Sequence, residues 1–111
     1  MTVARLKAEL WVAAALRQGM LADKPAVVVR RGDPDAGGVL VKLYAKAGCV
    51  VLSPFRDPSG AQAWLRATGG APVAEIVADA YIGRQIQVDP DLWVLEFEAP
   101  DHLPPFEGKI V

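Results

Sequence analysis

Apolar residues recur at the spacing of an α-helix from residue 3 to residue 18, where most residues are good helix formers. The stripe that we expect to face the core consists of Val3, Leu6, Leu10, Ala13 and Ala14. Gly19 predicts the end of this helix. Trp11, Val12 and Leu16 lie outside that stripe, and a helix that is apolar on more than one side usually packs against two partners. We therefore expect these residues to form a homodimer contact surface, with Trp11 as its anchor.

The next part of the chain contains short stretches that are rich in β-branched residues or alternate between apolar and polar positions, as strands do. They cover residues 26–31, 39–45, 49–52 and 61–67. The turn residues at 32–38 are expected to join the first two as a hairpin, so that all of these strands form an antiparallel meander. The last stretch also fits two helical turns. The turn residues around it leave room only for a short element and favour a strand.

A second helix is predicted from residue 72 to about residue 87, where apolar residues again recur at helical spacing after a Gly-Gly break. A final strand is expected at residues 92–98. One face of this strand carries Trp93, Leu95 and Phe97. Residues 99–111 are rich in proline and show no periodicity, so we expect them to form a loose C-terminal tail.

The resulting order, α-β-β-β-β-α-β, predicts an α+β fold in which one mostly antiparallel sheet of about five strands carries two helices. Residues 1–98 are expected to form a single globular domain that precedes the tail at 99–111. The strand at 26–31 is mostly apolar, which favours coverage on both of its sides and thus a three-layer arrangement. The pattern leaves open which face of the sheet each helix occupies.

Composition narrows the classes of function. The 111 residues include 12 Lys and Arg against 13 Asp and Glu, and the formal net charge is −1. This balance disfavours nucleic-acid binding, which depends on a positive surface. No apolar run approaches the roughly 18 residues of a membrane span, so we expect no membrane partner. The single cysteine excludes a disulfide scaffold and favours a reducing compartment, the cytoplasm.

Several segments together resemble a known family. They are R-L-K-A-E-L-W-V at 5–12, R-R-G-D-P-D-A-G at 30–37, V-L-V-K-L at 39–43 and D-P-D-L-W-V at 89–94. In this order they resemble an uncharacterised bacterial family, Domain of Unknown Function family 1491 (DUF1491). The resemblance covers residues 5–98 and implies a compact α/β protein of the bacterial cytoplasm. It implies no activity, cofactor or catalytic residue.

The loop at residues 30–38 is the strongest local feature that could carry chemistry. Its residue types are those of a hairpin turn, in which Asp opens the turn, Pro fixes φ and the glycines adopt positive φ. This is the interpretation that we favour. In the alternative, Asp33 and Asp35 hold a divalent cation through their oxygens, while Arg30 and Arg31 bind a phosphate or carboxylate.

The triplet Asp-Pro-Asp occurs twice, at residues 33–35 and 89–91, each time just before a predicted strand. If the two strands are neighbours in the sheet, Asp91 joins the loop aspartates and the carboxylates gather at one edge as a hard-cation site. Lys42, on the strand after the loop, completes the candidate anion-binding set. The simpler interpretation, which we favour, is that the triplet only guides the chain into a strand.

These observations rank three functions. The first is a non-catalytic interaction module that forms a homodimer, because no nucleophile, general base or zinc site is recognisable in the sequence. The second is a metal-assisted hydrolase that acts on an anionic, phosphate-containing substrate. The third is a nucleotide or RNA binder that uses the same arginines without chemistry. We expect no cofactor, since the glycines at 37 and 38 lead into a strand and not into a phosphate-binding helix.

Overall fold

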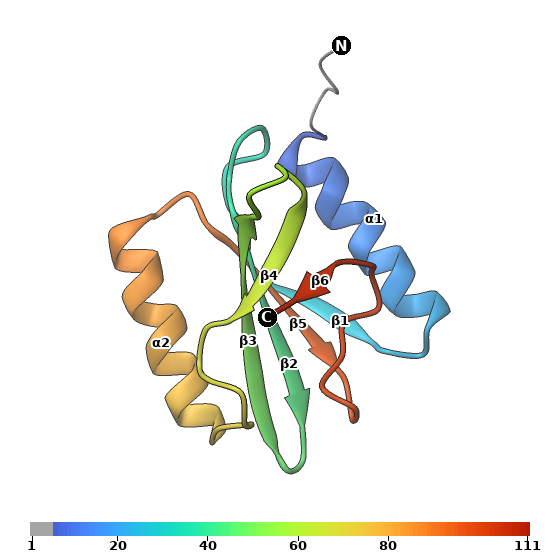
Figure 1. Cartoon of the computed structure of the whole chain (residues 1–111), viewed down its shortest axis with the longest axis vertical. Helices are drawn as coiled ribbons and strands as arrows, with labels where there is room; N and C mark the ends of the chain where they lie inside the picture. The colour runs from blue at the N-terminus through green and yellow to red at the C-terminus, as the bar shows by residue number, and fades with distance from the viewer. Residues whose placement is uncertain (1–5) are drawn as a thin grey trace.

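The computed structural model describes residues 6–111, which form two helices and one six-stranded sheet (Figure 1). The elements are α1 (Ala8–Leu21), β1 (Ala26–Arg30), β2 (Val39–Ala45), β3 (Gly48–Arg56), β4 (Gln62–Arg66), α2 (Glu75–Val88), β5 (Trp93–Glu98) and β6 (Lys109–Ile110). The predicted order is confirmed from α1 to β5, including the strand in the ambiguous stretch at 61–67. The short strand β6 is an addition.

The sheet has the strand order β1-β5-β2-β3-β4-β6. The antiparallel meander is confirmed for β2, β3 and β4. It is wrong for β1, which pairs antiparallel with β5. Because β5 also pairs in parallel with β2, and β6 with β4, the sheet is mixed. β5 is apolar and buried over most of its length, which suits a strand between two neighbours. The expected hairpin at 32–38 is wrong: this segment crosses the N-terminal end of β5 and connects β1 to β2 on its two sides.

The helices pack on opposite faces of the sheet and produce three layers (Figure 1). The α1 face holds the larger apolar cluster, which includes Trp93, Leu95 and Phe97, all on one side of β5 as predicted. The α2 face holds a smaller cluster that includes Ile82 and Val94. The sheet is thus the central layer, and each helix buries one side of it.

Helix α1 contacts the sheet with a different side from the one predicted. Its buried residues are Ala8, Val12, Ala15 and Gly19. The expected core stripe is wrong, since Leu10 is 53% exposed, and Val3 lies outside the described residues. Gly19 does not end the helix; a Cβ there would lie 2.9 Å from Cε1 of Phe97. Most positions of α1 are apolar, so hydrophobic spacing favours no single side, and close approach to the sheet selects the side with small residues.

The C-terminal segment packs on the domain, so the expectation of a loose tail is wrong. Phe106 is buried, and its ring centre lies 5.2 Å from that of Trp11 and 5.1 Å from that of Trp64. Residues 109–110 then form β6 along β4. Single residues make these contacts without any repeat along the chain, and a search for periodicity therefore misses them.

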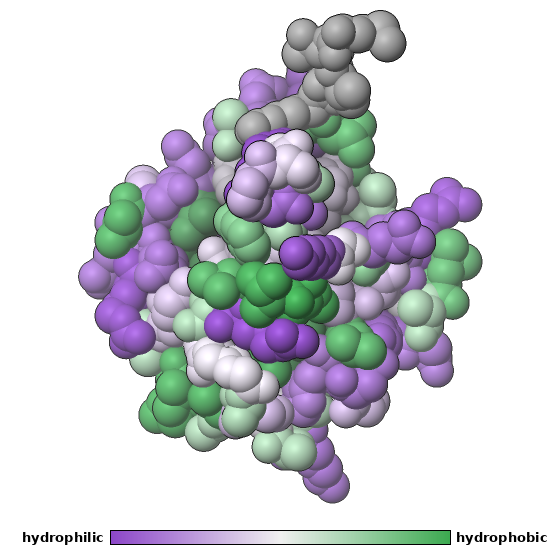
Figure 2. Space-filling view, in the orientation of Figure 1, coloured by the Kyte–Doolittle hydropathy of each residue, from purple (hydrophilic) through white to green (hydrophobic). Residues whose placement is uncertain are grey.

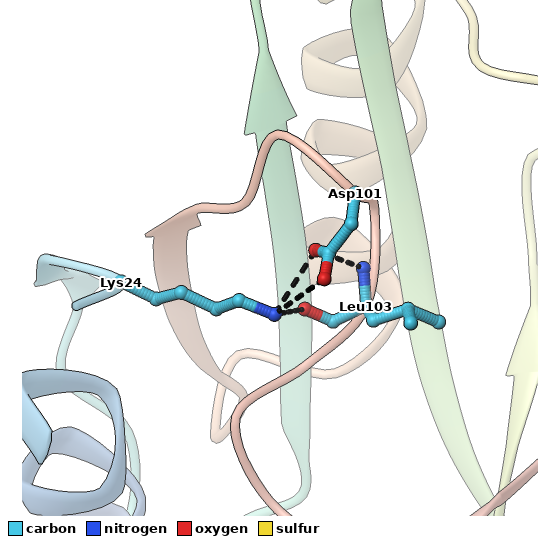
Figure 3. Close-up of polar contacts among 3 residues, drawn as sticks. All are labelled: Lys24, Asp101 and Leu103. Carbon is cyan, nitrogen blue, oxygen red and sulfur yellow. Dashed lines mark hydrogen bonds and ion pairs between the residues drawn. The ribbon is translucent and has the colours of Figure 1, made fainter. Parts of the chain in front are cut away.

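Polar contacts hold the same segment against the turn that follows α1. Lys24 Nζ donates to both carboxylate oxygens of Asp101, at 3.0 and 3.1 Å, and to the C=O of Leu103 at 2.8 Å (Figure 3). The hydrogen bond from Lys24 holds the pKa of Asp101 below its ordinary value. On the other side, Nε2 of His102 lies 2.9 Å from the C=O of Gly48. The segment is thus attached at two points before Phe106 enters the core.

Candidate functional site

Lys42 is the one buried charged residue within residues 6–111, and it connects α2 to the sheet. β2 directs its side chain to the α2 face, where the residue is only 4% exposed. Its Nζ lies 2.7 Å from Glu75 and 2.8 Å from Asp79, which are one turn apart at the start of α2, and 3.1 Å from Glu96 on β5. Glu96 stands beside Lys42 in the parallel register of β2 and β5.

This cluster keeps Lys42 charged and fully partnered. Burial by itself lowers the pKa of Lys42, but the hydrogen bonds to Asp79, Glu75 and Glu96 outweigh it and raise the pKa above its ordinary value. An ammonium group has three N–H donors, and here each faces a carboxylate. The cluster also contains more negative than positive charge. Lys42 therefore has no donor to offer an external anion.

The other two predicted anion-binding residues lie apart from Lys42. Arg30 donates from Nη2 to the C=O of Pro90 at 2.6 Å, and its Nε has no hydrogen-bond partner. The guanidinium of Arg31 is exposed and lies 5.3 Å from the ring centre of Trp93, which faces α1. Lys42 faces α2, on the other side of the sheet. The fold does not bring these three cations together.

The two Asp-Pro-Asp segments do meet, because β2 and β5 are parallel neighbours. Their contacts, however, run through the backbone: the N–H of Asp33 donates to the C=O of Asp91 at 3.0 Å, and Nε1 of Trp93 donates to the C=O of Asp33 at 2.8 Å. A Cβ on Gly32 would lie 2.2 Å from the C=O oxygen of Asp91. The close approach of these two chain segments therefore requires this glycine.

Two carboxylates of the triplets, those of Asp33 and Asp89, accept hydrogen bonds within their own turns. Oδ2 of Asp33 accepts from the N–H of Ala36 at 2.8 Å, and Oδ1 of Asp89 accepts from the N–H of Asp91 at 3.1 Å. The carboxylate of Asp35 is exposed and pairs with Lys7 at 3.5 Å. Within residues 6–111, no group of three or more acidic, His or Cys side chains is placed to hold a metal ion. These contacts are those of turn residues at a strand entry.

The predicted contact residues of α1 pack in or against the core: Val12 is buried, and Trp11 and Leu16 are partly buried. Trp11 packs on Trp64, with ring centres 5.6 Å apart. Val12 is buried, and Leu16 is partly buried against the same cluster. The structure places all three toward the sheet and not on the outer side of the helix, because α1 is rotated relative to the prediction.

β1 forms an exposed apolar edge that the sequence pattern did not predict. Its outer side pairs with no strand of the described chain, and Val27, Val28 and Val29 are 57%, 41% and 56% exposed. The apolar run was interpreted as a strand covered on both sides, which is wrong. Arg30 and Arg31 at the end of the run are the signal that could have indicated an edge, where charged residues are common.

An open groove of about 660 Å³ lies on the α1 face, between the start of α1, residues 35–39 and the ends of β3 and β4. Its apolar lining includes Leu6, Trp11 and Trp64, and charged side chains stand beside them. The predicted sites did not include this groove, because it is formed by three segments that are distant in sequence.

Comparison with known proteins identifies the family. The family model described as "Protein of unknown function (DUF1491)" matches residues 6–107. The chain belongs to the DUF1491 family. The resemblance found in the sequence is thereby confirmed. A comparison with curated proteins finds no match.

Solved structures agree with this assignment. The crystal structure of a DUF1491 family protein from Caulobacter crescentus CB15 is 32% identical, with a TM-score of 0.86, over 96% of this chain and 100% of that chain. An NMR structure of a DUF1491 family protein from the same organism is 31% identical, with a TM-score of 0.83, over 98% and 99%. Protein Atu0922 from A. tumefaciens shares the fold at 24% identity, with a TM-score of 0.77 over 96% and 98%.

These names and the family description state no activity, so the function of this DUF1491 protein has to be argued from its own surfaces. None of the helices within residues 6–111 combines the length and apolar character needed to cross a bilayer.

Proposed function

We propose that this DUF1491 protein is a non-catalytic interaction module of the bacterial cytoplasm and that it forms a homodimer through the outer edge of β1. The observation that carries the proposal is the free edge itself, with three adjacent exposed valines. An edge strand of this kind is a template for pairing with another chain. Met20 and Leu21, at the end of α1 just before the turn into β1, are also exposed and enlarge the apolar surface.

The backbone of β1 presents a defined set of hydrogen-bonding groups. The N–H of Glu98 donates to the C=O of Pro25 at 2.9 Å, so Pro25 bonds inward to β5. In an antiparallel ladder, residues whose N–H and C=O groups bond to the neighbouring strand alternate with residues whose groups point away from it. Val27 therefore also bonds inward, and Ala26 and Val28 turn their N–H and C=O groups to the free edge. A second copy that runs antiparallel, with its Val28 opposite Ala26, satisfies all of these groups.

Charge supports an antiparallel second copy over other partners. Arg30 and Arg31 stand at the C-terminal end of β1. The other end is acidic on balance: Asp23 lies in the preceding turn and Glu98 opposite Pro25, whereas Lys24 and Asp101 neutralise each other as a pair at 3.0 Å. In an antiparallel pair, the basic end of each strand lies against the acidic end of the other. The same edge is thus complementary to itself, as a two-fold interface requires.

The opposite edge of the sheet is less suited to pairing. Figure 2 shows hydrophobic side chains gathered over β4, β6 and the C-terminus, where Leu65 and Val111 are exposed. β6, however, contains only two residues. So short an edge strand offers few backbone groups to a partner and is a common way of protecting a sheet edge. We therefore place the interface at β1.

The contacts of the charged residues favour this function over metal-assisted hydrolysis. The carboxylates of Asp33 and Asp89 accept hydrogen bonds within their turns, and all donors of Lys42 face carboxylates. These groups are committed to the fold and are not directed at a common point where a substrate would bind.

The test is the molar mass of the full chain by sedimentation equilibrium, for the wild type and two matched variants. Val28→Lys places a charge in the pairing edge, and Val77→Lys makes the same change on α2, where the exposure is similar, 49% against 41%. We expect the wild type and Val77→Lys to approach twice the chain mass with rising concentration. Val28→Lys should dissociate at least about tenfold more readily.

A wild type that stays monomeric up to high micromolar concentration would overturn the homodimer. So would a dimer that Val28→Lys and Val77→Lys weaken equally, since the contact would then lie elsewhere. Circular dichroism of both variants is the control that tests whether the substitutions leave the fold intact.

A further inference from the structure

The groove on the α1 face has an aromatic floor. Trp11 is half-buried and supplies the accessible ring, whereas its neighbour Trp64 is only 2% exposed; the two ring planes are inclined by 39°. Within residues 6–111, the groove lies between the segment that leads into α1 and the last part of β3, which runs to Arg56. Aromatic side chains at the bottom of a concave surface are typical of small-molecule sites, because their faces contact planar apolar groups.

The rim of the groove carries an excess of positive charge. Lys7, Asp35 and Arg56 line it. Lys7 and Asp35 are 3.5 Å apart, and both side chains are largely exposed, so this pair is weak and Lys7 is free to exchange its partner. Nη1 of Arg56 donates to the C=O of Gly60 at 2.7 Å. A guanidinium has five N–H donors, so Arg56 keeps several for a ligand.

We propose that this groove binds a small planar anion: an aromatic body that lies against the accessible ring of Trp11, with a carboxylate, sulfonate or phosphate that pairs with Lys7 or Arg56. The volume of about 660 Å³ lies within the usual range of pockets for small organic ligands. The aromatic floor selects a planar apolar body, and the net positive rim selects an anion over a neutral or cationic ligand. This site is separate from β1 and does not depend on the dimer.

A matched pair of probes tests both parts of the proposal. 1-Anilinonaphthalene-8-sulfonate carries a planar body and one negative charge, and N-phenyl-1-naphthylamine has the same body without the charge. We expect saturable binding of the sulfonate at one site, with quenching of tryptophan fluorescence because Trp11 lines the groove. The neutral probe should bind about twofold to fivefold more weakly, as expected for one exposed ion pair.

Matched variants locate the site. Leu6 lines the groove just before α1 and is 61% exposed, whereas Leu10, in the first turn of α1, is 53% exposed and does not line it. Leu6→Ser should weaken both probes about threefold to tenfold, and Leu10→Ser should leave both unchanged. Arg56→Gln should weaken the sulfonate alone, and Arg84→Gln, at an exposed position of α2, should weaken neither. Val28→Lys should bind like the wild type.

Several results would overturn the proposal. Equal effects of Leu6→Ser and Leu10→Ser, or of Arg56→Gln and Arg84→Gln, would indicate general surface binding. A loss of binding in Val28→Lys would move the probe to the β1 edge. An absence of saturable binding would exclude the site, and thermal melts of each variant would confirm that the compared proteins are folded.

Discussion

The two faces of the sheet hold their helices by different means. On the α1 face, Phe97, Trp11, Trp64 and Phe106 form an aromatic cluster, and α1 approaches it with small residues. On the α2 face the apolar cluster is smaller, and Lys42 with its carboxylates adds an ionic contact between helix and sheet. Steric fit between the small residues of α1 and the aromatic cluster holds α1 on the sheet, and the ion pairs of Lys42 contribute to holding α2. The faces should therefore respond differently to cavities, to added volume and to pH.

The largest expected effect is that of a cavity in the α1 face. Phe97→Ala removes a fully buried ring and should lower the free energy of unfolding by about 3–5 kcal/mol. Ile82→Ala, at the buried side of α2, should cost about 2–3 kcal/mol, because the smaller cluster loses fewer contacts. Urea unfolding of both variants measures the difference. Equal losses of unfolding free energy would contradict the prediction, because the apolar clusters of the two faces would then contribute equally to stability.

The next effect concerns the ionic contact of the α2 face. Lys42→Met leaves Glu75, Asp79 and Glu96 without their cation, and we expect a loss of about 2–3 kcal/mol at neutral pH. The carboxylates are partly exposed, which keeps the loss below that of a fully buried pair. The loss should shrink in acid, where the carboxylates are protonated. A loss that is independent of pH would indicate packing as its cause.

Alkaline pH tests the same contact in the wild type. The folded pKa of Lys42 is raised above its ordinary value of 10.5, so its contribution is fully present below that pH. Above about pH 10.5 the unfolded chain loses this proton while the folded chain keeps it, and stability falls as the pH rises. The urea midpoint of the wild type should therefore decrease more steeply in this range than that of Lys42→Met. Parallel curves would contradict this role.

Two glycines, Gly19 in α1 and Gly83 in α2, allow a comparison of how closely each helix approaches its neighbours. A Cβ on Gly19 would lie 2.8 Å from the C=O oxygen of Lys24 and 2.9 Å from Phe97, whereas a Cβ on Gly83 would meet nothing within 4 Å. Gly19→Ala should therefore destabilise by about 1–2 kcal/mol through overpacking. Gly83→Ala should stabilise by about 0.5–1 kcal/mol through helix propensity. Thermal melts that shift in the same direction for both variants would refute the difference in helix approach.

The smallest effect concerns the C-terminal segment, which supplies Phe106 to the α1 face. Asp101→Asn weakens the contact with Lys24 and should cost about 0.5–1 kcal/mol at neutral pH. The pKa of Asp101 is lowered in the folded state, so this contribution is present above its ordinary value of 3.8 and is lost as the pH falls below it. Glu107→Gln, at an exposed position of the same C-terminal segment, is the control and should change stability little. A difference that persists at lower pH would exclude the ion pair as the cause.

Much of the secondary structure was predictable because its signals are local. The apolar runs of β2 and β5 are set by neighbouring residues and are visible in the chain, whereas the buried side of α2 is Ala78 and Ile82 and not the predicted stripe, in which Ile76 is 79% exposed. The tail was not predictable in this way, since Phe106 and Lys24 act through single contacts with distant residues. The candidate sites were the least predictable, because their chemistry depends on which side chains the sheet brings together.

Lys42 illustrates that limit. In sequence it is a lysine on a strand beside an arginine-rich loop, which suggests anion binding. Only the parallel pairing of β2 with β5, and the position of α2 over that face, place Glu96, Glu75 and Asp79 around it. The meeting of the two Asp-Pro-Asp segments likewise depends on strand order, and the carboxylates of Asp33 and Asp89 accept hydrogen bonds within their own turns.

The sequence by itself determined the elements, their order and the membership in the DUF1491 family, because each depends on residues that are near one another in the chain or on the match of its segments. Tertiary structure decided the insertion of β5 beside β2, the rotation of α1 and the exposure of β1. These outcomes depend on steric fit between distant surfaces. A single glycine at position 19 determines how closely a helix approaches the sheet, and hydrophobic spacing contains no information about that distance.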